Sequence, residues 1–141
     1  LANNEPLTVG SLSHGGGVLS LALHEGMKAG GVETRLGWAC DVNDSLLEHA
    51  SEVNPAWTDK TQSLAMSFSE LAFDQWSMSK LAPAQIIECG IPCQASSTAG
   101  RAKNGNGCAE ENGNVGYLVA ALLAIIARVN PVAVVLECVK P

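Results

Sequence analysis

A proline and a cysteine meet at residues 92 and 93, where an apolar run of the sequence stops. The upstream stretch AQIIECG, residues 84–90, is typical of a buried strand, and the stretch that follows Cys93 is small and polar. A cysteine thiolate is a strong nucleophile, and it acts best when it is exposed in a cleft beside a polarising group. Cys93 is therefore a candidate nucleophile, although a cysteine after such a run is as often a packed core residue.

Acidic residues close two other apolar runs. Glu137 ends VAVVLE at residues 132–137, where one more apolar residue would be the ordinary choice, and its carboxyl group could exchange a proton with a substrate. Asp41 follows VETRLGWAC at residues 32–40. An acid at this point can accept hydrogen bonds from the ribose of a nucleoside cofactor, whereas the alternative is an ordinary loop acid.

A glycine turn precedes Asp41 in the sequence GSLSHGGGVL, residues 10–19. Glycines let the backbone approach a ligand and leave the amide groups of a following helix accessible. The stretch is neither a GxGxxG motif nor a P-loop, so a plain tight turn explains it equally well when it is taken alone. The turn and Asp41 together predict a nucleoside site.

The elements that position these residues alternate along the chain. We expect strands at 6–12, 32–40, 64–68, 84–89 and 132–137, and helices at 18–29, 44–54, 70–80 and 115–129. Asp44 is the expected cap of the second helix. The pattern predicts an α/β fold with a doubly wound, mainly parallel sheet, in which the turn, Asp41, Cys93 and Glu137 share the edge where the strands end. The run at 132–137 predicts a strand buried on both faces.

The composition restricts the classes of protein. The chain has 141 residues, of which 47% are hydrophobic and 16% charged, as expected for one globular domain. Its longest apolar run, residues 117–127, is too short to cross a bilayer. Five irregularly spaced cysteines favour a reducing compartment over a disulfide scaffold or a zinc site. The net charge of −6 predicts that any nucleic-acid-binding surface is confined to a small part of the chain or is supplied by another part of the protein.

Three stretches, in this order, resemble motifs of DNA cytosine-5 methyltransferases: SLSHGGGVLSLALHEG (11–26), IPCQASSTAGR (91–101) and VLECVKP (135–141). Pro92-Cys93-Gln94 matches the family's Pro-Cys-Gln motif, and Glu137-Cys138-Val139 corresponds to its Glu-Asn-Val motif. The resemblance implies a Rossmann-like sheet of the S-adenosylmethionine-dependent methyltransferase type, truncated after about the fifth strand. Residues 1–141 would then be the N-terminal part of the S-adenosylmethionine-binding catalytic domain, with the target-recognition domain absent from the chain.

The same resemblance implies methyl transfer from S-adenosylmethionine to carbon 5 of a cytosine that is flipped out of the duplex. Cys93 would add to carbon 6, and Glu137 would pair with and protonate N3. The implied partner of the full-length protein is double-stranded DNA, with no membrane and no metal, and we expect a cytoplasmic protein of prokaryotic or phage origin. The implied cofactor-binding residues are Ser13, His14, Gly15, Gly17, Asp41, Val42 and Pro92, and the implied DNA contacts are Gln94, Ser97 and Arg101.

Several positions depart from the family's motifs, among them Ser13 and Val42 where aromatic residues are usual, and Cys138 where asparagine is usual. These departures leave open a catalytically degenerate, methyltransferase-like protein that binds a nucleoside, DNA or a protein. A third hypothesis is a cysteine hydrolase or thiol oxidoreductase. A hydrolase needs a histidine near Cys93, and His14 is the only one expected at the correct edge of the sheet.

Overall fold

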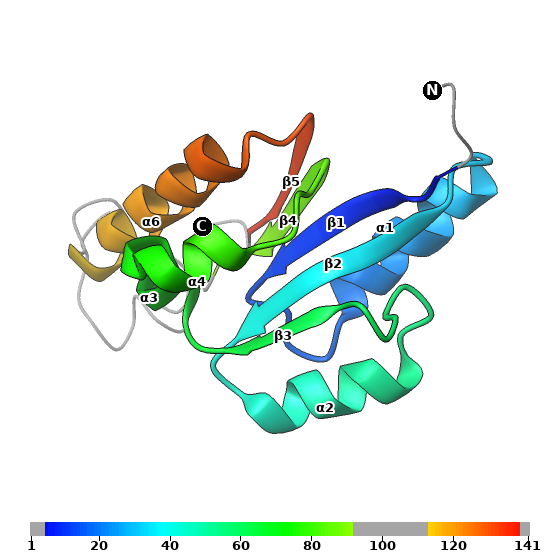
Figure 1. Ribbon diagram of the computed structural model, residues 1–141, viewed down its shortest axis with the longest axis horizontal. Helices are drawn as coiled ribbons and strands as arrows, with labels where there is room; N and C mark the ends of the chain where they lie inside the picture. The colour runs from blue at the N-terminus through cyan, green and yellow to red at the C-terminus, as the bar shows by residue number, and fades with distance from the viewer. Residues whose placement is uncertain (1–4, 92–112, 139–141) are drawn as a thin grey trace.

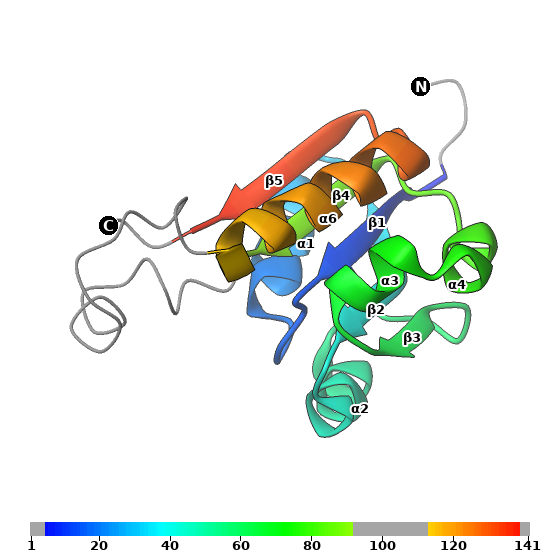
Figure 2. The same cartoon turned by 90° about the vertical axis from the view of Figure 1, so that its left-hand side faces the viewer.

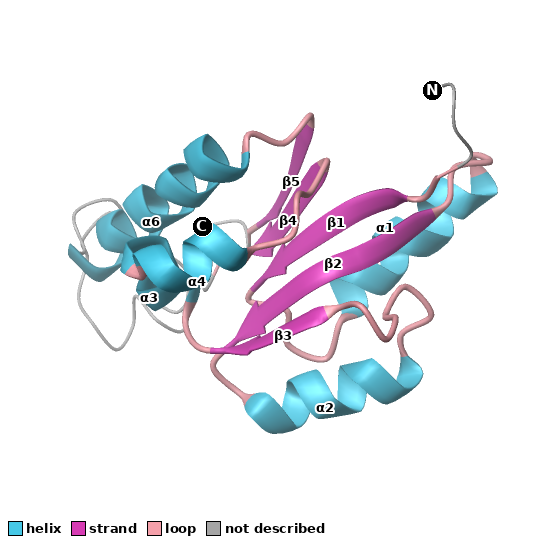
Figure 3. Ribbon diagram, in the orientation of Figure 1, coloured by secondary structure: helices cyan, strands magenta, loops and turns pink. Residues whose placement is uncertain are grey.

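The computed structural model describes residues 5–91 and 113–138, which form a parallel sheet with helices on both faces (Figures 1 and 3). The elements, in chain order, are β1 (Leu7–Leu12), α1 (Val18–Ala29), β2 (Thr34–Asp41), α2 (Asp44–Val53), β3 (Gln62–Ala65), α3 (Phe68–Phe73), α4 (Gln75–Lys80), β4 (Ile86–Gly90), α6 (Gly113–Val129) and β5 (Ala133–Glu137). The strand order is β3-β2-β1-β4-β5, and all four pairings are parallel. The predicted α/β class and doubly wound sheet are confirmed.

Two apolar clusters hold the layers together, one on each face of the sheet. On the first face, buried residues such as Leu12, Ile87 and Cys89 pack against α3, α4 and α6. On the second face, Val9, Leu36 and Ile86 pack against Leu23 and Met27 of α1. In Figure 2, α6 and α3 lie in front of the sheet and α1 lies behind it. The strand ends are therefore fixed by helices on both sides.

A bulge in β2 at Gly37 changes the face to which the strand's side chains point. Val9 of β1 pairs with Leu36, but the next residue, Gly10, pairs with Trp38, so Gly37 is an extra residue in β2. Leu36 consequently packs on the α1 face, whereas Trp38 packs on the opposite face. The fully buried indole of Trp38 donates a hydrogen bond to the Ala82 carbonyl (3.1 Å). The sequence pattern alone did not predict this bulge.

Two helix boundaries differ from the predicted ones. The cap of α2 is Asn43, whose side chain accepts a hydrogen bond from the Leu46 N–H, and Asp44 is instead the first helical residue. The helix expected at 70–80 is two helices that meet at Asp74. The backbone N–H of Asp74 bonds to carbonyls of α3, and its carboxylate accepts from Trp76 N (3.0 Å) at the start of α4.

The strand β5 is at the edge of the described sheet and is less buried than its sequence predicts. It pairs with β4 alone, and the exposed fractions of Val134 and Leu136 are 38% and 51%. The prediction of a strand buried on both faces is thus wrong for the described residues, because an apolar run does not specify which neighbours cover it. β3 begins two residues before its predicted start. No described helix has the length and hydropathy needed to span a bilayer.

Candidate functional site

The turn between β1 and α1 is held against the end of β2. Its backbone adopts the left-handed region at Ser13, Gly15 and Gly17, with φ of 51°, 54° and 76°. The N–H of His14 donates to the Cys40 carbonyl (3.1 Å), and the N–H of Gly15 donates to the Asp41 carboxylate (2.8 Å). The predicted glycine turn and Asp41 are therefore in direct contact.

Asp41 also accepts a hydrogen bond from the Asn43 N–H (2.9 Å) through its other oxygen. Each carboxylate oxygen has two lone pairs, so both retain capacity for a further donor such as a ribose hydroxyl. Beside Asp41 is a mostly apolar cavity of about 180 Å³. It is lined by Ser13, Cys40, Asp41, Val42, Met66, Ser67, Phe68 and Leu118. A larger cavity of about 450 Å³, between α4 and α6, is lined by none of the predicted site residues that the structure describes.

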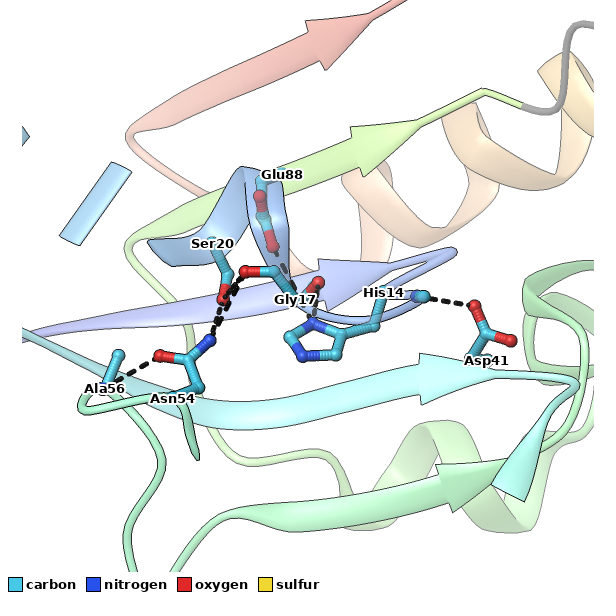
Figure 4. Close-up of polar contacts among 9 residues, drawn as sticks. His14, Gly17, Ser20, Asp41, Asn54, Ala56 and Glu88 are labelled. Carbon is cyan, nitrogen blue, oxygen red and sulfur yellow. Dashed lines mark hydrogen bonds and ion pairs between the residues drawn. The ribbon is translucent and has the colours of Figure 1, made fainter. Parts of the chain in front are cut away.

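The side chain of His14 lies beneath the turn rather than in this cavity (Figure 4). Its Nδ1 atom is 2.7 Å from Oγ of Ser11, and its ring contacts that of Trp57 edge-on, with 5.6 Å between centroids. Only the backbone of His14 can therefore face a ligand above the turn. The buried ring also lacks the exposure that a general base for an external thiol requires, which counts against the hydrolase hypothesis.

Glu88 is buried next to His14 and was not among the predicted site residues. It is 1% exposed, it pairs with Ser11 in the β1–β4 register, and its Oε1 atom is 3.9 Å from Nδ1 of His14. Burial raises the pKa of Glu88 to about 7, against a smaller lowering by its hydrogen bond with Ser11. Burial lowers the pKa of His14, which the negative charge of Asp41 partly opposes. The signal in the sequence was an acid inside an otherwise apolar strand.

Asn54 is a second residue that the sequence patterns did not single out. Its side-chain nitrogen donates to Oγ of Ser20 (2.6 Å) and lies 3.5 Å from the carbonyl oxygen of Gly17 (Figure 4). Its side-chain oxygen accepts from the Ala56 N–H (3.0 Å). The end of α2 is thereby attached to the first turn of α1. Local patterns identify Asn54 only as a helix end, because its contact with Gly17 spans 37 residues.

The ends of β4 and β5 bring Glu137 next to Gly90 and Ile91, the last described residues before Pro92. Gly90 pairs with Glu137, and the Ile91 N–H donates to the Glu137 carbonyl (3.0 Å). A Cβ atom on Gly90 would be 3.9 Å from Oε2 of Glu137. The exposed carboxylate is therefore next to the strand that leads into Pro92. The remaining predicted site residues, Pro92, Cys93, Gln94, Ser97 and Arg101, are outside the described residues.

Two of the other thiols are unsuited to nucleophilic chemistry. Cys40 and Cys89 are fully buried, and burial raises the pKa of each to about 12. Both stay protonated at neutral pH, and a thiol is a poor nucleophile compared with its thiolate. Within residues 5–91 and 113–138 there is no group of three or more metal-ligating side chains.

No protein-family model matches the chain, and no curated protein sequence matches it. Among solved structures it is similar to the CMeT domain of the citrinin polyketide synthase (12% identity, TM-score 0.48, covering 87% of this chain and 27% of that one). It is also similar to a putative S-adenosylmethionine-dependent methyltransferase from Listeria monocytogenes (12% identity, TM-score 0.41, covering 67% of this chain and 36% of that one). A third similar structure is that of a SAM-dependent methyltransferase from Agrobacterium tumefaciens (14% identity, TM-score 0.44, covering 65% of this chain and 28% of that one). The chain spans about a third or less of the length of these structures.

Proposed function

We propose that this chain carries the S-adenosylmethionine-binding part of a DNA (cytosine-5-)-methyltransferase. The observation that supports it best is the pairing of Gly90 with Glu137, because it brings a carboxylate beside the strand that leads into Pro92-Cys93-Gln94. The glycine turn and Asp41 are at the same edge of the sheet, where ligands of doubly wound folds bind. Nucleophile, acid and cofactor site would thus share one edge.

The residues around Asp41 fit a nucleoside. Val42, Met66 and Phe68 give the cavity an apolar lining suited to a flat base, and the free lone pairs of Asp41 suit ribose hydroxyls. The first turn of α1, which follows Gly17, offers backbone N–H groups that suit the carboxylate of the cofactor. When bound, S-adenosylmethionine supplies the methyl group.

In the proposed reaction the thiolate of Cys93 forms a bond to carbon 6 of the flipped cytosine, and Glu137 donates a proton to N3. Electron density then moves to carbon 5, which becomes able to take the methyl group. Loss of the proton from carbon 5, cleavage of the bond between sulfur and carbon 6, and return of the N3 proton to Glu137 release the product and regenerate the thiolate and the protonated acid. Gln94, Ser97 and Arg101 are the proposed DNA contacts, which the chain needs because its net charge is −6.

In the full-length protein, a duplex that contains 5-fluorocytosine tests this proposal, because fluorine at carbon 5 prevents the final proton loss. We expect a denaturation-resistant adduct between protein and DNA that requires S-adenosylmethionine and is absent in Cys93→Ser. Cys108→Ser, a thiol outside the matched motifs, is the control and should form the adduct. No adduct with the unsubstituted protein, or an adduct that persists in Cys93→Ser, would overturn the proposal.

The catalytically degenerate alternative gives a different result in the same experiment. Ser13 and Val42, which depart from the family's motifs, both line the cavity at Asp41. A protein of this kind would bind S-adenosylhomocysteine in a calorimeter and form no adduct with the fluorinated duplex. Adduct formation contradicts the alternative, so the two functions are separated by one pair of measurements.

A further inference from the structure

Two buried polar atoms beneath the glycine turn lack a hydrogen-bond partner within the described part of the chain. They are Nε2 of His14 and Oε2 of Glu88. The side chains that carry them are 0% and 2% exposed. Leaving a buried polar atom unpaired costs free energy, so such atoms in a native fold call for a physical explanation.

A single hydroxyl connects the two side chains. Oγ of Ser11 is 2.7 Å from Nδ1 of His14, and Ser11 is paired with Glu88 in the β1–β4 register, where its hydroxyl lowers the pKa of the acid. A serine hydroxyl has one proton, so it donates to one neighbour and accepts from the other. The direction of the two hydrogen bonds is therefore coupled, and the protonation state of Glu88 determines it.

We propose that Glu88 is a positioning residue that sets, through the Ser11 hydroxyl, which ring nitrogen of His14 carries the proton beneath the turn. With Glu88 protonated, its O–H donates to Ser11, Ser11 donates to Nδ1, and the ring proton is on Nε2. With Glu88 ionised, Ser11 donates to the carboxylate, Nδ1–H donates to Ser11, and Nε2 carries a lone pair.

The two states differ by one proton, and the ring of His14 is neutral in both. On ionisation the proton of Glu88 passes to the Ser11 oxygen, and the former Ser11 proton passes to Nδ1. The proton on Nε2 then leaves to solvent. Nothing else is transferred, and no other reactant is needed.

Nε2 of His14, which carries a proton in one state and a lone pair in the other, is next to the start of α1. A Cβ atom on Gly17 would be 2.8 Å from Nε2 of His14 and 3.0 Å from the side-chain nitrogen of Asn54. The first turn of a helix presents unpaired N–H groups and a partial positive charge. A lone pair on Nε2 complements this charge, whereas an Nε2–H group opposes it. Ionisation of Glu88 therefore favours the tautomer that complements the first turn of α1, although the buried charge itself lowers the stability of the fold.

Other titratable groups lie near this cluster on several elements, with Cys89 on the opposite face of the sheet. Burial lowers the pKa of His14, and the negative charge of Asp41, at the end of β2, acts in the opposite direction. Cys89, next to Glu88 in β4, stays neutral because burial raises its pKa. Glu137 of β5 is two register positions beyond the partner of Glu88 and is exposed. On α1, the buried His24 is engaged with Thr34 (2.8 Å). Glu88 is the buried carboxyl group of the cluster, and burial raises its pKa to about 7.

Nitrogen NMR of the His14 ring tests the proposal without any ligand, because the two neutral tautomers and the cation have distinct ¹⁵N shifts. We expect a change of tautomer with a midpoint near pH 7. Glu88→Gln should keep one tautomer from pH 5 to 9, and Ser11→Ala should uncouple His14 from Glu88. Glu52→Gln, an exposed acid on α2, is the control and should behave as the unsubstituted protein. A single tautomer at every pH in the unsubstituted protein, or simple formation of the cation, would overturn the proposal.

The consequence for the cofactor turn rests on the proposed function and is measured separately. By calorimetry, S-adenosylhomocysteine should bind roughly 3- to 10-fold more tightly at pH 8 than at pH 6, as one hydrogen bond of difference allows. In Glu88→Gln this dependence should be absent, and in Glu52→Gln it should persist. If S-adenosylhomocysteine binds at no pH, the proposed function is contradicted. The role of Glu88 in setting the His14 tautomer is then decided by the NMR experiment alone. Equal pH dependence in Glu88→Gln contradicts the role of Glu88.

Discussion

The indole of Trp38 lies directly over Gly10, where any side chain larger than hydrogen would overlap it. A Cβ atom on Gly10 would be 2.0 Å from Cζ2 of Trp38. The contact exists because the bulge at Gly37 brings Trp38, rather than its predecessor, opposite Gly10. The indole is fully buried and holds the segment before β4 through the Ala82 carbonyl, so it cannot move aside freely.

Gly10→Ala should therefore destabilise the fold by about 3 kcal/mol, at the upper end of the range for overpacking. Urea denaturation followed by tryptophan fluorescence measures the change. Gly26→Ala is the matched control: the added methyl group would have no neighbouring atom within 4 Å, and alanine in a helix interior stabilises by about 0.5–1 kcal/mol. Equal stability of the two variants would mean that Trp38 does not occupy this position.

The buried acid Glu88 should make the stability of the protein fall as pH rises. Its pKa is raised from 4.5 in the unfolded chain to about 7 in the fold. Below pH 4.5 the carboxyl group is protonated in both states, so no penalty arises. Between pH 4.5 and 7 the unfolded chain ionises first, and above about pH 7 the folded state is less stable by about 3 kcal/mol.

Glu88→Gln removes this titration, because an amide is neutral at every pH. We expect its free energy of unfolding to exceed that of the unsubstituted protein at pH 8 and to approach it at pH 4.5. Denaturant titrations at several pH values measure the difference, with Glu52→Gln as the exposed control. A constant difference between the two proteins across this range would show that the pKa of Glu88 is the same in the fold as in the unfolded chain.

Gly17 and Gly15 are both left-handed, but only Gly17 has a close neighbour. At Gly17, φ is 76° and a Cβ atom would be 2.8 Å from Nε2 of His14, whereas at Gly15, φ is 54° with nothing within 4 Å. Alanine in the left-handed region costs about 1–2 kcal/mol at either position. Gly17→Ala should lose about 1–2 kcal/mol more, because the His14 ring must shift. Thermal denaturation compares them, and equal losses would exclude the His14 contact.

Much of the sheet could be predicted from the sequence because its strands and helices produce patterns among neighbouring residues. Apolar runs predicted the strands, and the positions of glycine, proline and acids predicted the edge at which the strands end. The contact of Gly15 with Asp41 and the pairing of Gly90 with Glu137 are consequences of parallel register, which the alternation of strands and helices already implies.

The rest depends on contacts between distant residues, which a single sequence does not reveal. The bulge at Gly37 alters a face without leaving a periodic signal, and Asn54 acts through Ser20, 34 residues away. Asp74 divides one expected helix because its carboxylate competes with the helix backbone for the N–H groups that follow it. Glu88 is a different case: one acid inside an apolar run marks a buried polar position, but the run does not show that Ser11 and His14 lie beside it.

Asp41 should have two separable roles, one in holding the glycine turn and one in binding the cofactor. Asp41→Asn keeps one oxygen acceptor, which can serve either Gly15 or Asn43, whereas Asp41→Ala keeps none. We expect Asp41→Ala to weaken binding of S-adenosylhomocysteine by roughly 10- to 100-fold, as the loss of two hydrogen bonds allows, with a smaller effect for Asp41→Asn.

Calorimetry at constant pH measures these affinities, and thermal denaturation of the same samples reports the turn. Asp59→Ala, an exposed acid before β3, is the control for lost charge and should change neither quantity. If Asp41→Ala lowers stability but leaves the affinity unchanged, Asp41 only holds the turn, and the ribose must bind elsewhere. If Asp41→Ala lowers the affinity while its melting temperature stays equal to that of Asp41→Asn, the carboxylate itself contacts the ligand, because the turn is then held equally well in the two variants.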